Sequence, residues 1–174
     1  MKVLVLGGGP GGLYAAILLR KAHPDWKVTL VERNPPDATY GWGIVFSDRT
    51  LASFREADVE SYGAIVDRFM LWDVIEVRHG EQAVRCGGNV IAGISRKVLL
   101  DVLQRRAREL DVELVFRSEV GDLSLLERYD LSIAADGANS FVRRSLATAF
   151  RPRVQLGRWI EHRRIGERER GGHQ

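Results

Sequence analysis

A glycine pattern near the start of the chain, Gly7-x-Gly9-x-x-Gly12, constrains the fold more than any other feature. It directly follows the apolar run Val3–Leu6 and directly precedes the apolar, helix-forming run Leu13–Leu19. A strand, a glycine turn and a helix in this order are what a dinucleotide-binding α/β unit requires. Gly7 permits a tight turn, Gly9 lets the backbone approach a pyrophosphate, and Gly12 lets the helix pack closely against the sheet. We therefore expect ligand phosphates at the N-terminus of this helix.

A second strand, Lys27–Val31, ends on Glu32, which lies 20 residues beyond Gly12. At this spacing the fingerprint places a carboxylate for the ribose hydroxyls. Because Glu32 would repel a 2′-phosphate, we expect FAD or NAD rather than NADP. A glycine-rich turn with an incidental surface acid is the alternative interpretation. Replacing Glu32 by alanine is expected to weaken nucleotide binding by ~1.5–3 kcal/mol, and replacing it by glutamine should weaken binding less.

Composition favours one α/β domain of a cytoplasmic protein. The chain has 174 residues, of which 45% are hydrophobic, and no apolar run approaches the length of a membrane span. The single cysteine, Cys86, suits a reducing compartment and has no partner at a metal-binding spacing, so we expect no metal site. The net charge of +3 comes from arginines that alternate with acids, which indicates a solvated surface rather than a nucleic-acid groove.

The middle of the chain predicts further elements. A helix is expected from Asp48 onward, capped by Ser47 or Asp48 itself, and an antiparallel hairpin over residues 71–87, with its turn at His79-Gly80. The glycine-spaced aromatic segment Tyr40–Ser47 is either a loop packed by its own aromatic side chains or backbone that lies against a flat cofactor.

The second half of the chain returns to an alternation of helix and strand. A long amphipathic helix, Arg96–Leu110, is followed by strand Val112–Phe116, a short helical stretch near 124–126 and strand Leu131–Ala135. Arg96 stands in the first turn of its helix, where the helix dipole disfavours a cation, so we expect it to have an anionic partner.

Asp136-Gly137 follows the last strand and precedes a helix that begins near Asn139 or Ser140. A carboxylate at the carboxyl edge of a parallel sheet, beside a helix N-terminus, lies where open α/β folds bind ligands. The alternative is that Asp136 only caps the following helix.

Together, the glycine fingerprint, Glu32-Arg33, Arg96 and Asp136-Gly137 resemble the flavin-dependent aromatic hydroxylases of the para-hydroxybenzoate hydroxylase class. The segment 39–48 is most similar to the salicylyl-CoA 5-hydroxylase branch and its tryptophan hydroxylase relatives. The resemblance implies a Rossmann-like FAD-binding domain with a small antiparallel β insertion. The implied chemistry is hydroxylation of an aromatic or aryl-CoA substrate by a monooxygenase that uses FAD, O2 and NAD(P)H as co-substrate. The cofactor-binding residues that we expect are Gly7, Gly9, Pro10, Gly11, Gly12, Glu32, Arg33, Arg96, Asp136 and Gly137.

The expected domain spans residues 1–156, with hairpin 71–87 as part of a substrate-side layer, and the Arg/Gly-rich residues 157–174 read as a disordered or non-native tail. The resemblance also implies a later Gly-Asp motif that holds the flavin ribityl chain, and none follows in this sequence. The sequence therefore resembles only the N-terminal part of the family, and we expect a truncated chain without hydroxylase turnover. Apolar faces such as Val112–Phe116 should then be poorly shielded, favouring self-association. An NAD- or FAD-dependent reductase, an NAD-binding module without flavin and a non-catalytic nucleotide-binding remnant remain alternatives.

Overall fold

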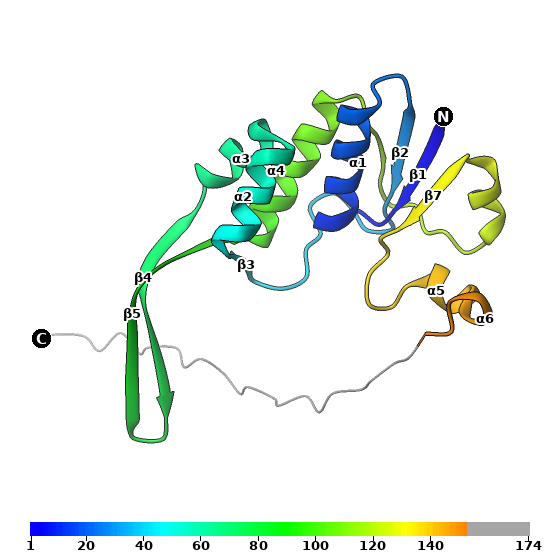
Figure 1. The fold of residues 1–174 in the computed structure, drawn as a ribbon. Coiled ribbons are helices and arrows are strands. Elements are labelled where there is room, and N and C mark those ends of the chain that lie inside the picture. The colour runs from blue at the N-terminus through cyan, green and yellow to red at the C-terminus, as the bar shows by residue number, and fades with distance from the viewer. Residues whose placement is uncertain (153–174) are drawn as a thin grey trace, which may run out of the picture.

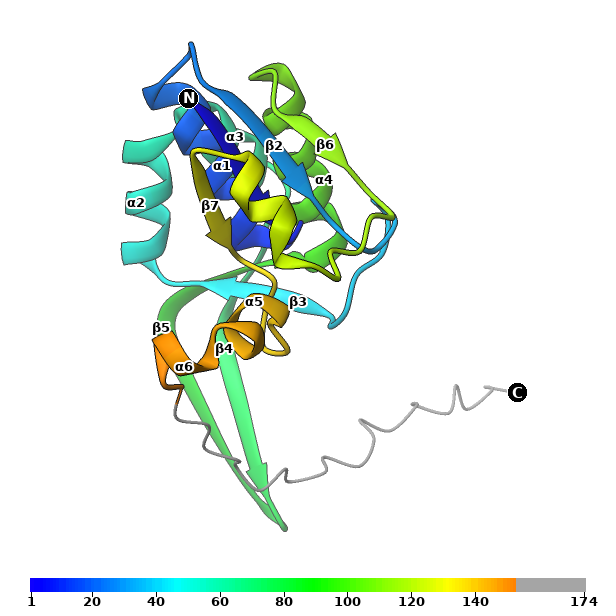
Figure 2. The ribbon, with the colours of Figure 1, turned by 90° about the vertical axis from the view of Figure 1, so that its right-hand side faces the viewer.

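A parallel four-stranded sheet forms the centre of the molecule (Figures 1 and 2). The computed structural model describes residues 1–152, with the side chains of residues 48, 89 and 90 left out. The strands lie in the order β6-β2-β1-β7, and every neighbouring pair is parallel. Their bounds are Lys2–Leu6 for β1, Lys27–Val31 for β2, Glu113–Val115 for β6 and Leu131–Ala134 for β7. This arrangement confirms the α/β fold class.

Layers on both faces of the sheet bury its central strand. Val3 and Val5 of β1 point to one face and pack with α1 (Pro10–Ala22) and α4 (Arg96–Glu109). Leu4 and Leu6 point to the opposite face, which η1 (Leu123–Arg128) covers together with α5 (Phe141–Ser145). The short helix α6 (Ala147–Phe150) follows α5 and has no buried residue. Because both faces are covered, β1 reads as a continuous apolar run rather than an alternating one.

The predicted edge strand Val112–Phe116 is better shielded than its sequence suggested. Val112 is buried, Leu114 packs against the core on the α1 and α4 side, and Val115 packs against the core on the η1 side. The prediction that this strand exposes an apolar face is therefore wrong. The short helical stretch predicted near 124–126 is η1, and its packing against this side of the sheet was not predicted.

A buried carboxylate ties the helical layer together. Asp58 precedes α3 (Val59–Val66), where its Oδ2 accepts a hydrogen bond from the Ser61 backbone N–H at 3.1 Å. Its Oδ1 lies 2.7 Å from Lys21 Nζ on α1 and 2.9 Å from Arg106 Nη2 on α4. Burial alone would raise the pKa of Asp58, but the hydrogen bonds from Arg106, Lys21 and Ser61 outweigh it and hold the pKa well below its ordinary value. Three helices thus meet at one charge.

The antiparallel insertion is larger than predicted. It contains β3 (Gly43–Phe46), β4 (Met70–His79) and β5 (Gln82–Ser95), in the order β3-β5-β4. The hairpin of β4 and β5 is confirmed, and it extends away from the body of the molecule (Figures 1 and 2). β5 runs on past residue 87 to pair with β3, which lies in the segment Tyr40–Ser47 that was not predicted as a strand.

The remaining elements follow the sequence closely. Ser47 caps α2 (Asp48–Ala57) by accepting a hydrogen bond from the Thr50 N–H at 3.3 Å. Ser95 stands at the N-cap position of α4, although its side chain makes no capping hydrogen bond. No helix in residues 1–152 is both long and apolar enough to cross a lipid bilayer. The predicted tail, 157–174, lies outside the described residues.

Candidate functional site

Two glycines of the fingerprint are required by packing. Gly7 has φ +106°, and a Cβ there would lie 2.3 Å from the Ala135 carbonyl oxygen. A Cβ on Gly12 would lie 2.0 Å from the Gly7 carbonyl oxygen. No larger residue fits at these positions without moving the backbone. The close approach of α1 to the sheet at Gly12, expected from the sequence, is confirmed.

Gly9 is different, because nothing in the protein lies within 4 Å of where its Cβ would be. Its backbone is extended, with φ −71° and ψ 173°, a conformation open to any residue. Gly9 immediately precedes α1, which begins at Pro10, so the free N–H groups of the first helical turn lie beside it. Glycine at this position leaves empty space in front of a helix N-terminus.

Glu32 holds the glycine loop from the end of β2. Its Oε2 accepts a hydrogen bond from the Gly8 N–H at 2.6 Å. Its Oε1 accepts two hydrogen bonds from Asn34, one from the backbone N–H at 2.8 Å and one from Nδ2 at 2.6 Å. The carboxylate predicted to contact ribose is therefore also part of the loop's own structure.

One cavity of about 330 Å³ brings most of the predicted site together. It lies where the carboxyl ends of the parallel strands meet, as expected for an open α/β sheet. The predicted residues that line it are Gly7, Gly9, Glu32, Arg33, Arg96, Asp136 and Gly137. Pro10, Gly11 and Gly12 do not line this cavity, since they begin α1 behind the loop.

The cavity also has walls that sequence reasoning missed. The segment Ser118–Gly121, which follows β6, lines it, as do Asn34, Asn139 and Arg144. The available signal was topological: β6 pairs with β2, so the segment after β6 must emerge beside Glu32. The backbone confirms this placement, because the Ser118 N–H donates to the Glu32 carbonyl at 3.0 Å.

Asp136 caps a helix and also lines the candidate cavity. Its Oδ2 accepts hydrogen bonds from the N–H groups of Phe141 at 2.7 Å and Val142 at 3.3 Å, so it caps α5. It also lines the cavity. Burial raises the pKa of Asp136, but hydrogen bonds from Ser140 and from these backbone N–H groups lower it below its ordinary value.

Arg96 begins α4 and lies at the same cavity as Gly9. It lines the main cavity and an adjoining hollow of about 90 Å³, both of which also include Gly9 and Glu32. Among the side chains that the structure describes, no ion pair involves Arg96. The structure therefore places Arg96 and Asp136 on one cavity, although 40 residues separate them.

The aromatic segment 40–47 is not packed by all of its aromatic side chains. Trp42 is 98% exposed and Tyr40 is 71% exposed, whereas Phe46 packs against Phe54 and Phe69. The interpretation of this segment as a self-packed loop is therefore wrong for Tyr40 and Trp42. Tyr40 instead lies at the cavity.

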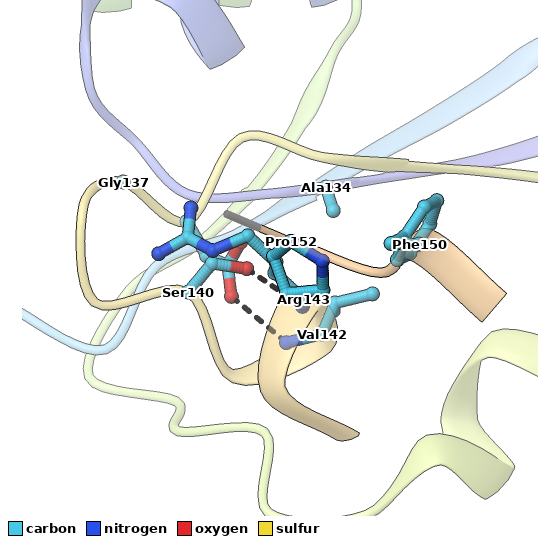
Figure 3. A pocket seen from close by; sticks show the side chains of 8 residues that line it. Ala134, Gly137, Ser140, Val142, Arg143, Phe150 and Pro152 are labelled. Carbon is cyan, nitrogen blue, oxygen red and sulfur yellow. Dashed lines mark hydrogen bonds between the residues drawn. The ribbon is translucent and has the colours of Figure 1, made fainter. Parts of the chain in front are cut away.

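A second cavity, of about 390 Å³, shares Asp136 and Gly137 with the first and is drawn in Figure 3. Its walls are mostly apolar and include Val142, Phe150 and Pro152, with Arg143 at its edge. No residue of the glycine loop lines it. Because phosphate-binding groups gather around the first cavity, that cavity is the candidate site.

The sheet order, the glycine loop and the acid at the end of β2 define a nucleotide-binding domain of the Rossmann type. The family described as FAD binding domain matches residues 1–124 of this chain. The chain therefore belongs to that family.

Two curated relatives show which members of the family this chain is similar to. The chain is 45% identical over 157 residues to salicyloyl-CoA 5-hydroxylase from a Streptomyces species, a match that covers 90% of this chain and 30% of that protein. It is 33% identical over 164 residues to protodeoxyviolaceinate monooxygenase from Chromobacterium violaceum, a match that covers 91% of this chain and 43% of that protein. The chain thus spans less than half the length of these relatives.

Solved structures agree with this assignment. Tetrameric 2-methyl-3-hydroxypyridine-5-carboxylic acid oxygenase superposes with a TM-score of 0.70 at 26% identity, covering 83% of this chain and 42% of that one. The predicted resemblance to the flavin-dependent aromatic hydroxylases is confirmed, and it concerns their N-terminal, FAD-binding part.

Proposed function

We propose that the 330 Å³ cavity binds FAD, with the adenosine ribose at Glu32 and the pyrophosphate between Gly9 and Arg96. The observation that carries this proposal is the convergence of Gly7, Gly9, Glu32, Arg96 and Asp136 on one cavity at the carboxyl edge of the sheet. The empty space beside Gly9 supports it, because a phosphate can approach the helix N-terminus there without meeting a side chain.

The charges around the cavity fit this placement. Arg33, Arg96 and Arg144 line it and can balance the two charges of a pyrophosphate. Glu32 favours the free hydroxyls of FAD over a 2′-phosphate, which it would repel. Asp136, whose carboxylate caps α5, faces the same cavity and with Gly137 forms its wall on the pyrophosphate side.

For the whole protein we propose hydroxylation of an aromatic or aryl-CoA substrate, with O2 and with NAD(P)H as reductant. The names of the relatives support this substrate class, and the single cysteine supports a reducing, cytoplasmic compartment. When bound, FAD supplies the redox chemistry of such a reaction. The residues described above bind and orient the cofactor.

The binding proposal is tested by titrating the purified chain with FAD and recording absorbance and calorimetric heat, with a matched pair of variants. Gly9→Ala places a methyl group in the space reserved for phosphate, and we expect it to weaken FAD binding by about 1–3 kcal/mol. Gly63→Ala is the control, because its Cβ also meets nothing within 4 Å but Gly63 lies in α3 and does not line the cavity.

The two variants give distinct outcomes. Both should fold as the wild type does, and only Gly9→Ala should lose affinity. Equal affinities for FAD in both variants would remove the glycine loop from the site. A wild-type chain that binds NAD but not FAD would instead support an NAD-binding module. Hydroxylation is tested separately, by following NADH or NADPH oxidation and product formation with salicyloyl-CoA.

A further inference from the structure

A chain of hydrogen bonds reaches the Glu32 carboxylate from the loop that follows β2. The Tyr40 hydroxyl donates to Asn34 Oδ1 at 3.3 Å, and Asn34 Nδ2 donates to Glu32 Oε1 at 2.6 Å. The other carboxylate oxygen, Oε2, accepts from the Gly8 N–H at 2.6 Å. This chain links the aromatic segment to the glycine loop through one asparagine.

The distribution of these hydrogen bonds leaves one oxygen of Glu32 with a free acceptor site. A carboxylate has about four acceptor sites, two on each oxygen. Oε1 uses both of its sites on the backbone and side chain of Asn34, whereas Oε2 uses one, on Gly8. A ribose hydroxyl that enters the cavity therefore meets a carboxylate whose free acceptor site is on Oε2, beside the glycine loop.

Asparagine is suited to this position for a chemical reason. Its amide presents a donor to the carboxylate and an acceptor to the Tyr40 hydroxyl, and that bond fixes which end of the amide faces Glu32. Independently of the side chain, the backbone carbonyl oxygen of Asn34 accepts a hydrogen bond from the Arg117 backbone N–H at 3.2 Å, which ties the loop to the segment after β6. An aspartate of the same shape would place a second negative charge against Glu32.

We propose that Asn34 is a positioning residue for ribose recognition: it holds the Glu32 carboxylate so that Oε2 faces the adenosine ribose. This inference rests on the proposed FAD site and deepens it. Asn34 lines the same cavity as Glu32 but acts through it. Its side chain should therefore affect FAD affinity only while the Glu32 carboxylate is present.

The first experiment needs no ligand. The Gly8 amide proton, which donates to Glu32, is followed by ¹H–¹⁵N correlation spectra of the wild type and of the Asn34→Ala, Asn34→Asp, Glu32→Ala and Asn139→Ala variants. We expect Asn34→Ala and Asn34→Asp to move this resonance towards its position in Glu32→Ala. Asn139→Ala, which alters another side chain of the cavity, should leave it in place. An unmoved Gly8 resonance in both Asn34 variants would overturn the inference.

The second experiment is a double-mutant cycle on FAD affinity. Asn34→Ala should weaken FAD binding about tenfold in the wild-type background and have little effect in the Glu32→Ala background. Asn34→Asp should lose more than Asn34→Ala, whereas a purely space-filling role would make the isosteric aspartate the milder change. Asn139→Ala should have the same effect in both backgrounds.

The two proposals fail in different ways. If the wild type binds FAD and Asn34→Ala binds it equally well, or if the effects of Asn34→Ala and Glu32→Ala simply add, the positioning role is overturned and the FAD site stands. If the wild type does not bind FAD, the proposed function fails and the inference falls with it. Thermal unfolding of each variant identifies any loss of affinity that is only loss of fold.

Discussion

At the scale of single residues, Glu32 serves both the loop and the proposed ligand. Its two oxygens already accept three hydrogen bonds from Gly8 and Asn34. If Glu32 contacted only the ribose, Glu32→Gln would weaken binding less than Glu32→Ala, because the glutamine amide can still accept one hydrogen bond. The structure reverses that expectation, because the amide nitrogen of glutamine must face either the Gly8 N–H or the donors of Asn34.

We therefore expect Glu32→Gln to weaken FAD binding by about 1.5–3 kcal/mol, as much as Glu32→Ala does. Isothermal titration with FAD measures the difference. Glu119→Gln is the matched control, since it removes the same charge from the same cavity at a residue that is exposed. Affinity of Glu32→Gln within twofold of the wild type would show that the loop tolerates the amide.

At the scale of elements, short-range sequence patterns predicted helices and strands well, whereas strands that depend on pairing with distant residues were missed. The bounds of β1, α1 and β2 follow from residues close together in sequence. β3 was missed because it is short and pairs with residues about 50 positions later, such as Ile44 with Ile94. The full length of β5 was missed because Gly87, Gly88 and Gly93 interrupt the strand pattern.

The candidate site shows the same division. The glycine loop and Glu32 were predictable from spacing, whereas the segment Ser118–Gly121 enters the cavity only through the pairing of β6 with β2. The Asp58 cluster was also missed, because Lys21, Asp58 and Arg106 come from three separate helices. No short-range pattern in the sequence relates them.

The Asp58 cluster gives a prediction about stability and pH. Asp58→Asn keeps the shape of the α3 cap but removes the charge between Lys21 and Arg106, and we expect the free energy of unfolding to fall by about 3 kcal/mol at pH 7. Because the pKa of Asp58 in the folded protein lies below its ordinary value of 3.8, its stabilisation is present above that value. It is lost as the pH falls through 3.8 towards the folded pKa.

Urea unfolding measured between pH 7 and pH 2.5 checks this prediction. The wild type should lose stability below about pH 4 more steeply than Asp58→Asn, although Asp136 contributes a slope of the same sign to both. Asp101→Asn, on an exposed position of α4, should follow the wild-type profile. Parallel curves for the wild type and Asp58→Asn would show that the ion pairs do not stabilise the fold.

At the scale of the whole molecule, the structure consists of a well-covered parallel sheet and an exposed hairpin. Along β4 and β5 one face carries Glu76, paired with Arg78 and with Arg85 at 3.0 Å. Alternate positions point to the other face, so the cross-strand pairs Ile75 with Cys86 and Val77 with Val84 form an apolar surface. Val77 is 58% exposed and Val84 is 61% exposed.

This apolar surface, rather than Val112–Phe116, should drive self-association of the chain. An exposed sheet face of this kind, bordered by the free edge of β4, is a site of association between molecules. Sedimentation velocity at rising concentration should show association of the wild type and much less of the triple variant Ile75→Thr, Val77→Thr, Val84→Thr. Threonine keeps the β-propensity of these positions, so the hairpin itself should persist. The control is the double variant Arg78→Thr, Ala83→Thr, which changes the opposite face of the hairpin and should associate like the wild type. Equal sedimentation of the wild type and the triple variant would show that association uses another surface.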